Sequence, residues 1–518
     1  MADLGFWNFA AADPYGVALV TPDERKIARS DLAAESNRLA RGLRALGLET
    51  GDSVAVVLEN GQTFIELYLA CFQTGLYLVP INNHLAGPEI AYIVENSEAR
   101  VFVGSKAFAD TVVRAGEEMA IPPERRFAIG GLAGFRDPAE IKQGQSDAKL
   151  EDEIRTAGAV MNYTSGTTGR PKGVRRPLAP MDPDLIGGAF SAFHQMFGVT
   201  PQDDNVHIVG SPLYHTAVLM FAGSSLHLGH TVVLMEKWKP EEMLRLIDTY
   251  KVTTSHMVPT QFNRMLQLPK DVREKYDCSS TRAMVHAAAP CPIPIKRQML
   301  EWWGSSIWEY YAATEGGGTI VAPDEWLAKP GTVGKAWTGA EIKIFDEDGH
   351  ELPPNQPGTV YMRRGEADFE YYKDKGKTDE ARRGNYFTVG DVGYLDEDGF
   401  LFLNDRKNDM IISGGVNIYP AEIESTLITH PKVGDVAVFG IPHDDWGEEV
   451  KAVVEPIEGA APGEALTEEI LAWAADKLAK YKTPKSIDYI EEMPRDPNGK
   501  LYKRKLRDPY WEGRERAI

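Results

Sequence analysis

The sequence contains few cysteines, and their spacing fits neither a disulfide framework nor a metal framework. Cys71, Cys278 and Cys291 are the only cysteines among 518 residues. An odd, sparse set without a C-x-x-C pair argues against a disulfide scaffold and against a zinc site. The cysteine content therefore favours a reducing compartment, and we expect a cytoplasmic protein.

Long apolar runs and an excess of basic residues are also missing. No run approaches the ~18 apolar residues of a membrane span, so we expect no transmembrane segment. The N-terminal stretch MADLGFWNFAAADPYG has acidic residues and no basic n-region, which predicts no signal peptide. Lys and Arg number 56 against 76 Asp and Glu, a formal net charge of −20. This charge disfavours nucleic acid and anionic membranes as partners, and an anionic substrate would need local basic residues.

A chain of 518 residues is too long for one hydrophobic core, because cores stop growing near ~250–300 residues. We find no internal repeat. Short apolar runs alternate with helical patterns through most of the chain, as in the strands predicted at Ser53–Leu58 and Leu76–Ile81 and the helix predicted between them at Thr63–Gln73. Such alternation is typical of α/β layers with largely parallel sheets.

The pattern changes after about residue 340. A strand at Glu341–Phe345 leads into a DEDG turn, and Tyr394–Leu395 and Phe400–Leu403 flank a second DEDG turn as a hairpin would. These features predict a small β-rich subdomain.

A compact α+β unit is predicted from about Met410. Its helices are expected at Pro420–Thr429 and Leu466–Ala479, with Thr467 as the cap of the second. The polar stretch NDRKND at Asn404–Asp409 separates two apolar runs. The predicted organisation is an N-terminal domain over 1–404, a hinge over 405–409 and a C-terminal domain over 410–518.

The strongest chemical signal is the string Tyr163-Thr-Ser-Gly-Thr-Thr-Gly-Arg-Pro-Lys-Gly173. Its glycines and hydroxyl residues let backbone N–H groups approach phosphate oxygens, and Lys172 adds a cation. It is not a Walker A loop, because Lys172 follows proline and precedes neither Ser nor Thr. A generic Ser/Gly cluster is more often a surface turn, but a string of this length and content favours a phosphate site.

Six segments, taken together, make the chain resemble the adenylate-forming superfamily of acyl-CoA synthetases, 4-coumarate- and benzoate-CoA ligases, luciferases and peptide-synthetase adenylation domains. Each segment alone is compatible with chance, whereas their order and spacing over nearly the whole chain are specific. The segments are Met161–Gly173, Pro212–Thr216 (PLYHT), Tyr310–Glu315 (YYAATE), Tyr386–Asp398, Asp405–Glu424 and Pro494–Lys500 (PRDPNGK).

This resemblance implies an α/β fold in which layered α/β subdomains and a small β-rich subdomain form a large N-terminal domain, followed by a small mobile α+β C-terminal domain. It also implies an ATP-dependent carboxylic acid:CoA ligase that forms an acyl-AMP and releases pyrophosphate. The implied cofactors and substrates are ATP, Mg²⁺, CoA and a carboxylic acid. A homodimer is left open.

The resemblance further assigns the nucleotide site. Attack of a carboxylate on the α-phosphorus of ATP brings anions together, so cations must offset their repulsion. Glu315 would bind Mg²⁺, Thr314 would contact the α-phosphate, and Lys500 would bridge the carboxylate and the α-phosphate. The remaining implied contacts are Thr164, Ser165, Gly166, Thr167, Thr168, Gly169 and Lys172 for phosphates, Ala288, Ala289, Pro290 and Tyr311 for adenine, and Asp391 with Arg406 for ribose.

The C-terminal domain of the family works in two orientations. One brings Lys500 to ATP, and a rotation then presents the glycine-lined loop at Gly414 and Gly415 to the pantetheine arm. The pivot position, usually Asp or Lys, is Asn408 here. Trp446 would stack on the CoA adenine, with Tyr481 and Lys485 nearby; the alternative for Trp446 is packing between subdomains.

The acyl pocket implied by the resemblance contains His256, Ala287, Tyr310, Ala312 and Gly317, and His215 would gate it. Ala312 replaces a common glycine and would reshape the tunnel, and a core histidine is the alternative for His215. The small residues favour a hydrophobic medium- or long-chain, branched or cyclic acid, with aryl acids as the alternative.

Two further functions stay open. One is an adenylate former with a carrier-protein or oxygen acceptor. The other is a non-catalytic binder of nucleotide or a hydrophobic ligand, which the joint presence of Lys172, Glu315, Asp391 and Lys500 disfavours.

Overall fold

The computed structural model describes residues 4–151, 154–164, 171–201, 204–364, 369–406, 409–495 and 499–513. The chain forms two compact units. The first unit consists of Met1–His256, Leu268–Val285 and Ala367–Glu380, and the second of Met257–Gln267, His286–Glu366 and Ala381–Ile518. The chain therefore enters the second unit after His256, returns to the first unit twice, over Leu268–Val285 and Ala367–Glu380, and ends in the second.

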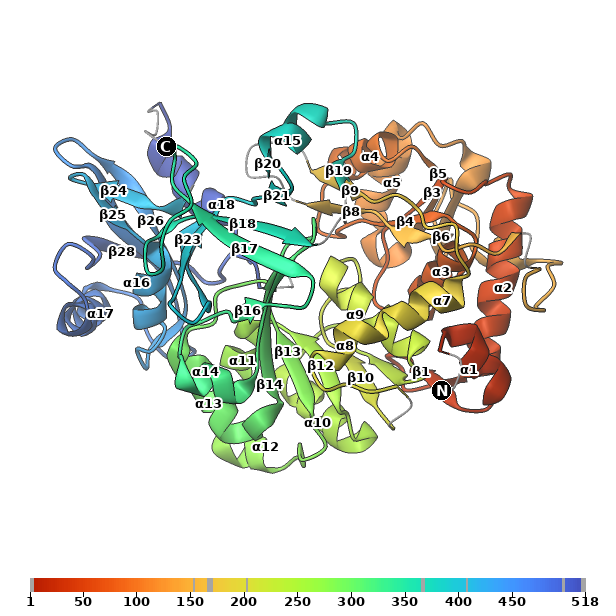
Figure 1. Cartoon of the computed structure of the whole chain (residues 1–518), viewed down its shortest axis with the longest axis horizontal. Helices are drawn as coiled ribbons and strands as arrows, with labels where there is room; N and C mark the ends of the chain where they lie inside the picture. The colour runs from red at the N-terminus through yellow and green to blue at the C-terminus, as the bar shows by residue number, and fades with distance from the viewer. Residues whose placement is uncertain are drawn as a thin grey trace. The chain divides into compact units, whose positions relative to one another are not determined.

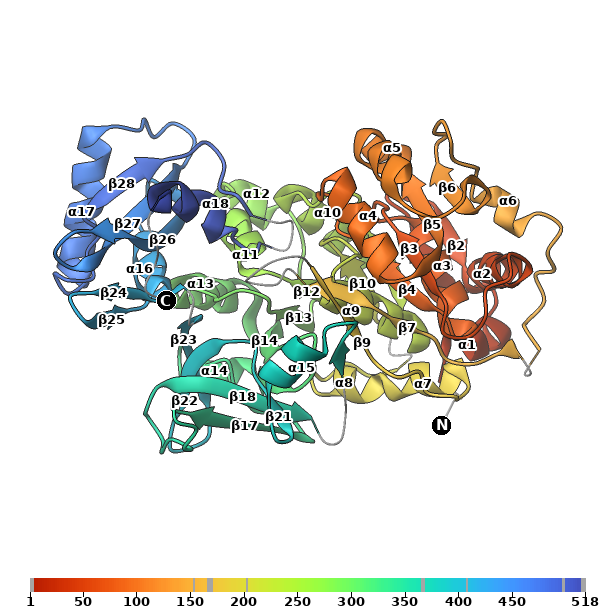
Figure 2. The same cartoon turned by 90° about the horizontal axis from the view of Figure 1, so that it is seen from above.

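A five-stranded parallel sheet is the centre of one layer in the first unit, with strand order β6-β5-β3-β4-β7. Its strands are β3 (Ser53–Val56), β4 (Tyr77–Pro80), β5 (Ala99–Ser105), β6 (Arg126–Ile129) and β7 (Ala159–Val160). Figures 1 and 2 show helices on both faces of this sheet. They are α2 (Arg29–Ala45), α3 (Gln62–Gln73), α4 (Gly87–Asn96) and α5 (Ala109–Glu118).

The alternation of side chains along β3 explains this double cover. Val54 and Val56 pack with the cluster that includes α2 and α3, whereas Ala55 and Val57 pack with α4 and α5. Successive side chains of a strand point to opposite faces, so a continuous apolar run is what a parallel sheet buried on both sides requires. The predicted α/β alternation is therefore present in the first unit.

A second set of largely parallel strands lies in the first unit. Strand β10 pairs in parallel with β11 and β12, β11 pairs with β1, and β2 is antiparallel to β1. The bounds are β1 (Val17–Val20), β2 (Lys26–Ala28), β10 (Val206–Val209), β11 (Thr231–Leu234), β12 (Thr254–Met257) and β13 (Ala283–His286). The first unit also contains the helices α1 (Phe6–Ala12), α6 (Ala139–Lys142), α7 (Pro183–Ala189), α8 (Ser191–Gln195), α9 (Thr216–His227), α10 (Pro240–Tyr250), α12 (Lys270–Glu274) and α15 (Lys375–Glu380).

The second unit contains the predicted β-rich part. Its six-stranded sheet consists of β17 (Ala340–Phe345), β18 (Gly358–Arg364), β20 (Arg382–Arg383), β21 (Tyr386–Phe387), β22 (Asp391–Leu395) and β23 (Leu401–Arg406), with antiparallel pairings. Antiparallel pairs also join β14 (Ile307–Ala312), β15 (Gly318–Val321) and β16 (Lys335–Ala336). Strand β23 continues through Arg406, so the first part of the polar stretch expected as a hinge is strand.

The last part of the second unit has a hydrophobic core of its own. Its strands are β24 (Ile411–Ser413), β25 (Val416–Ile418), β26 (Val433–His443), β27 (Gly447–Pro456) and β28 (Ser486–Tyr489), and its core includes apolar residues of α16 (Pro420–Leu427) and α17 (Glu464–Lys477). The second unit also contains α11 (Pro259–Leu266), α13 (Ile293–Trp303), α14 (Pro323–Ala328) and α18 (Lys503–Arg507). The boundaries predicted at 404 and 410 remain predictions.

Thr467 is not the cap of α17. The helix begins at Glu464 after Gly463, and the Thr467 hydroxyl lies 2.9 Å from the Tyr489 hydroxyl. The acidic side chain of Glu464 favours an earlier start, because it lies in the first turn at the positive end of the helix dipole. No helix among the described residues has the length and apolar character of a membrane span.

Several buried histidines make the stability of the fold depend on pH. Burial lowers the pKa of His194 and of His227 from 6.5 to about 3, and that of His256 to about 4. As the pH falls, these histidines are protonated at a higher pH in the unfolded chain than in the folded protein. This contribution to stability is therefore complete above about pH 6.5 and is lost as the pH falls toward 3.

We expect His194→Leu to reduce the loss of stability on acidification. The loss between pH 7.5 and pH 5.5 should shrink by about 1.4 kcal/mol, because one protonation event is removed. The first urea-unfolding transition at the two pH values measures this difference. Phe197→Leu is the control, because Phe197 packs against the same Phe221 ring as His194 and carries no titratable group, so the wild-type pH dependence should remain. An unchanged pH dependence in His194→Leu would contradict the assignment.

Candidate active site

The described ends of the phosphate-loop string form an antiparallel hairpin in the first unit. Strand β8 (Asn162–Thr164) pairs with β9 (Lys172–Arg175), and the register places Thr164 opposite Lys172. The string therefore connects two adjacent strands, as a loop around a phosphate would. Five predicted phosphate contacts lie outside the described residues, namely Ser165, Gly166, Thr167, Thr168 and Gly169.

The PLYHT segment is held by two asparagines that the sequence analysis missed. Asn60 donates to the carbonyls of Ser211 and Met235, both at 3.0 Å, and its side-chain oxygen accepts from the Leu213 amide at 2.8 Å. Asn162, at the start of β8, donates to the Tyr214 carbonyl at 3.3 Å. These bonds join the segment to the phosphate-loop hairpin. No sequence signal marks Asn60, because its partners lie about 150 residues away.

The two histidines predicted at the acyl pocket lie in different surroundings. His215 is half-buried at the N-cap position of α9, with its ring 4.3 Å from that of Tyr214. His256 is fully buried, and its ring lies 5.2 Å from Phe221. Because burial lowers the pKa of His256 to about 4, its imidazole is neutral near pH 7. Their roles toward an acid remain predictions.

A tight turn in the second unit carries Thr314 and Glu315. Strands β14 and β15 pair so that Ala312 lies opposite Gly318, which leaves five residues for the turn. Gly318 has φ +157°, and a Cβ there would lie 2.2 Å from the Tyr311 carbonyl oxygen. Only glycine fits this close approach. The turn buries Glu315, while a Cβ on the neighbouring Gly317 would lie 3.2 Å from Met362 Cβ.

Three of the predicted nucleotide residues meet in the second unit. The Tyr311 hydroxyl donates to Asp391 Oδ2 at 2.6 Å, and Arg406 Nε lies 3.5 Å from Asp391 Oδ1. Asp391 and Arg406 are register partners on β22 and β23. Burial raises the pKa of Asp391, and the positive charge of Arg406 and the Tyr311 hydrogen bond oppose that rise. The result is a fixed carboxylate with an acceptor geometry suited to hydroxyl groups.

Residues 288–290 (Ala-Ala-Pro), predicted to contact adenine, lie in the loop between β13 and α13, which we call the AAP loop. Ala288 has φ +71°, a conformation that a non-glycine residue adopts at a cost of order 1 kcal/mol. Ala287 is buried, whereas Ala288 and Pro290 are exposed, as a loop that offers its backbone to a ring would require. Tyr310 is buried next to the Tyr311 site, and Ala312 is exposed.

A buried ion pair joins α13, the helix that follows this loop, to β14. Lys296 on α13 donates to Glu309 on β14, and His286 Nε2 lies 3.5 Å from the same carboxylate. The Lys296 ammonium also lies 4.7 Å from the centre of the Trp326 ring. Burial raises the pKa of Glu309, and the charge of Lys296 opposes this. The pair fixes α13 relative to β14 at the base of the AAP loop, and the sequence analysis did not find it.

The predicted CoA-side residues gather in the last part of the second unit. Gly414 and Gly415 form the two-residue turn between β24 and β25, with φ +57° and +78°. Positive φ at both positions is what a type I′ hairpin turn needs. The Gly414 amide donates to the Trp446 carbonyl at 2.9 Å. The Trp446 ring is 47% exposed, stacks on His443 at 4.6 Å and has Lys485 Nζ 5.9 Å from its centre. Tyr481 is also exposed.

Described residues on both sides of Lys500 are held by hydrogen bonds and an ion pair. Arg495 donates from Nη1 to the Gly499 carbonyl at 2.7 Å and pairs with Asp435, and the Tyr502 amide donates to the Pro494 carbonyl at 2.8 Å. These bonds fix the chain on both sides of Lys500. The predicted pivot Asn408 lies outside the described residues.

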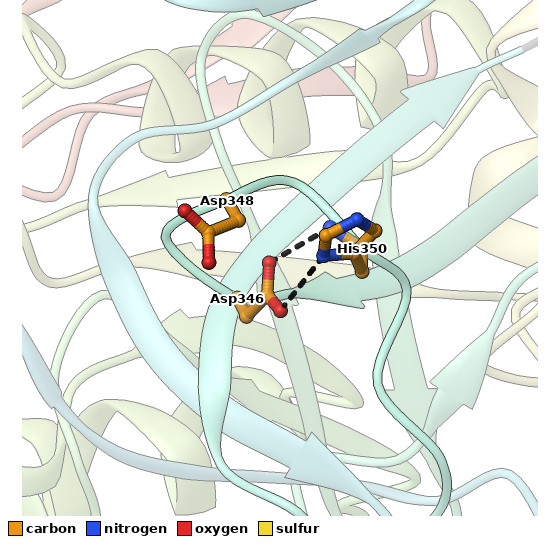
Figure 3. A group of neighbouring side chains, drawn as sticks. All are labelled: Asp346, Asp348 and His350. Carbon is orange, nitrogen blue, oxygen red and sulfur yellow. Dashed lines mark hydrogen bonds and ion pairs between the residues drawn. The ribbon is translucent and has the colours of Figure 1, made fainter.

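One group of metal-ligand side chains occurs among the described residues, at Asp346, Asp348 and His350 (Figure 3). The Asp346 carboxylate accepts from the His350 amide at 2.7 Å and lies 3.3 Å from His350 Nδ1. The carboxylate therefore closes the DEDG turn between β17 and β18. These contacts account for the group as a turn, and we assign no metal to it.

Comparison with known proteins agrees with this arrangement. The AMP-binding enzyme family matches residues 6–372, and the AMP-binding enzyme C-terminal domain matches residues 422–500. The chain is 32% identical to the fatty acid–[acyl-carrier-protein] ligase ScoC of Streptomyces coeruleorubidus, over 95% of this chain and 93% of that protein. It is 31% identical to the long-chain-fatty-acid–CoA ligase FadD13 of Mycobacterium tuberculosis, over 97% of each.

A solved structure extends the comparison to three dimensions. The o-succinylbenzoate CoA synthetase MenE of Bacillus subtilis, in complex with the acyl-adenylate intermediate OSB-AMP, matches with a TM-score of 0.80, 27% identity and 97% coverage of both chains. The chain therefore belongs to the AMP-binding enzyme family. The predicted family, the α/β fold class and the enzyme class, an AMP-forming acid–thiol ligase that uses ATP, are confirmed.

The buried ion pair at the base of the AAP loop gives a stability prediction. We expect Lys296→Met to destabilise the protein by about 3–5 kcal/mol, because it leaves the Glu309 carboxylate buried without its cation. Adding Glu309→Gln should recover part of this loss, since the second change removes the uncompensated charge. Urea unfolding of both variants measures the difference.

The exposed pair Lys375 and Asp379 offers a matched control, and Lys375→Met should cost less than about 1 kcal/mol. A double variant at Lys296 and Glu309 as unstable as the single one would contradict the electrostatic role of the pair.

Proposed function

We propose that the chain is an ATP-dependent carboxylic acid:CoA ligase that acts through an acyl-AMP. The observation that carries the nucleotide half of this proposal is the cluster of Tyr311, Asp391 and Arg406 in the second unit. It offers a buried carboxylate for ribose hydroxyls and an aromatic ring for adenine. The tight turn with Thr314 and Glu315 directly follows the strand that carries Tyr311.

In the first half-reaction, the acid's carboxylate attacks the α-phosphorus and pyrophosphate leaves. Lys172 and the loop after Thr164 would bind phosphates, Thr314 would contact the α-phosphate, and Lys500 would offset the charge that the two anions bring together. The carboxylate of Glu315 is the kind of oxygen ligand that fits Mg²⁺, which would neutralise phosphate charge when bound. Because hydrogen bonds hold the residues on both sides of Lys500, its backbone loses little conformational entropy when the side chain contacts ATP.

In the second half-reaction, a thiol attacks the acyl-AMP and AMP leaves. We place CoA at the Gly414–Gly415 turn, because the exposed Trp446 ring and the Lys485 ammonium lie beside it. An aromatic face and a cation suit an adenine and a phosphate. The relative ScoC is named for an acyl-carrier-protein acceptor, so a carrier-protein thiol is the second candidate.

The acid is proposed to be hydrophobic. Of the predicted pocket residues, His256, Ala287 and Tyr310 are buried, and the His256 imidazole is neutral. Uncharged residues of this kind favour a longer alkanoate or a cyclic acid over acetate, and an aryl acid is the alternative. A panel of both classes with ATP and CoA would identify it. The domain boundaries, the pivot at Asn408, the cytoplasmic location and a homodimer belong to the same proposal.

The role of Lys500 is testable by separating the half-reactions. Lys500→Ala should reduce acid-dependent pyrophosphate release by about 100-fold or more, because a transition-state cation is lost. Thioester formation from a supplied acyl-AMP should stay near the wild-type rate. Lys505→Ala on α18 is the control and should leave both steps unchanged. Equal damage to both half-reactions would exclude the assignment, and no pyrophosphate release with any acid would exclude the function.

The turn at Gly414 and Gly415 gives a prediction for the second half-reaction. Gly415→Val should slow thioester formation strongly and spare pyrophosphate release, because the added side chain obstructs the thiol and strains a residue with φ +78°. Gly459→Val controls for turn strain alone, since Gly459 has φ +86° and nothing within 4 Å of an added Cβ. Loss of both half-reactions in Gly415→Val, but not in Gly459→Val, would mean that this turn supports the first step.

A further inference from the structure

Strand β19 (Glu370–Tyr371) adds a third strand to the phosphate-loop hairpin. It pairs antiparallel with β9, with Tyr371 opposite Val174 and Glu370 opposite Arg175, and the sheet order is β19-β9-β8. Figure 1 shows β19 beside β9, although the two are separated by about 200 residues of sequence. The segment that carries β19, Ala367–Glu380, belongs to the first unit, whereas the chain on either side of it belongs to the second.

The ring of Tyr371 faces the lysine of the phosphate loop. Lys172 Nζ lies 5.1 Å from the centre of this ring, within the distance at which an ammonium is attracted to an aromatic face. Tyr371 is 9% exposed, and its amide donates to the Thr378 hydroxyl at 3.0 Å. The ring of Phe369 packs edge-on against it at 5.5 Å. The ring is therefore held in place, whereas a lysine side chain has four rotatable bonds.

The neighbouring Tyr372 attaches the same segment to the body of the first unit. Its amide donates to the Gly173 carbonyl at 2.8 Å, and its hydroxyl donates to Glu98 at 2.6 Å. Arg175 lies between two rings, 4.5 Å from the centre of Tyr372 and 4.6 Å from that of Tyr77. These contacts fix β19 against β9 and against the parallel sheet, so the position of the Tyr371 ring is set by the fold.

We infer that Tyr371 is a positioning residue for the phosphate-binding lysine of this ligase. Its ring holds the Lys172 ammonium at the start of β9, at the point where the phosphate loop ends. The Lys172 side chain therefore has fewer conformations in the unbound protein, so it loses less conformational entropy when it binds a phosphate. The inference depends on the proposed role of Lys172 toward ATP and adds a residue that the motif itself does not contain.

A plain packing role for Tyr371 makes a different prediction. If the ring only fills the core beneath β9, its removal should disturb the hairpin as a whole. The effect would then be independent of the side chain at position 172. A contact specific to the ammonium disappears when the ammonium is removed, so a double-mutant cycle separates the two roles.

The test is ATP binding by calorimetry, with Mg²⁺ and without an acid, on the full chain. Tyr371→Leu should weaken ATP binding about 3- to 10-fold, whereas Tyr371→Phe, which keeps the ring, should bind like the wild type. In a Lys172→Met background, Tyr371→Leu should have no further effect. Tyr372→Leu on the same segment is the matched control, and its effect should be the same with and without Lys172.

Each other result overturns one part of the argument. An equal loss from Tyr371→Leu in both backgrounds, or a loss in Tyr371→Phe as large as in Tyr371→Leu, would exclude positioning of Lys172. ATP affinity unchanged in Lys172→Met would instead exclude the proposed role of Lys172. Should Tyr371→Leu fail to fold, Tyr371→Met, with an unbranched side chain of similar reach, replaces it in the same cycle.

Discussion

The carboxylate of Asp391 is buried on strand β22, and the arrangement of the nucleotide side depends on how that charge is satisfied. Its two oxygens face Tyr311 from β14 and Arg406 from β23. A buried carboxylate without such partners would have to take up a proton or leave the interior. The pairing therefore fixes β14 relative to the six-stranded sheet. Because the turn with Glu315 directly follows β14, the same pairing also holds the start of that turn.

A second buried ion pair constrains the segment next to this site in the same way. Lys296 and Glu309 join α13 to β14, and the AAP loop with the strained Ala288 directly precedes α13, after His286, which lies 3.5 Å from the Glu309 carboxylate. A residue at positive φ persists only when the structure around it imposes that conformation. The ion pair supplies this constraint from below the loop, while the exposed backbone stays available to a ligand. Charges that contact no ligand thus determine the shape of the site.

The sequence predicted the elements that depend on local pattern. Helix α3 and strands β3 and β4 lie within about two residues of their predicted bounds, because apolar periodicity and flanking turns are local signals. The cap assigned to Thr467 was wrong by one helical turn, since several residues before an apolar stripe can begin a helix. The strand of β23 through Arg406 was missed, because NDR is polar and reads as a linker.

Contacts between distant segments are what the sequence did not reveal. Asn60 holds residues about 150 positions away, and Tyr371 faces a lysine about 200 positions earlier. Nothing in the local composition of either position differs from an ordinary helix cap or a buried aromatic residue. The motifs found by resemblance are the groups expected to touch a ligand. The residues found only in the structure are those that hold these groups in place, and their identity is a property of the fold.

The contrast between the two predicted ligand sites follows from the same reasoning. Asp391 and Glu315 are buried, with their positions fixed by strands and a tight turn, whereas Trp446 and Tyr481 are exposed beside a two-glycine turn. Groups that must stabilise charge in a transition state gain from being ordered beforehand. Groups that receive a long, flexible acceptor gain from an open surface, because the acceptor must arrive after the adenylate has formed and its product must leave. The burial of each set therefore fits the half-reaction proposed for it.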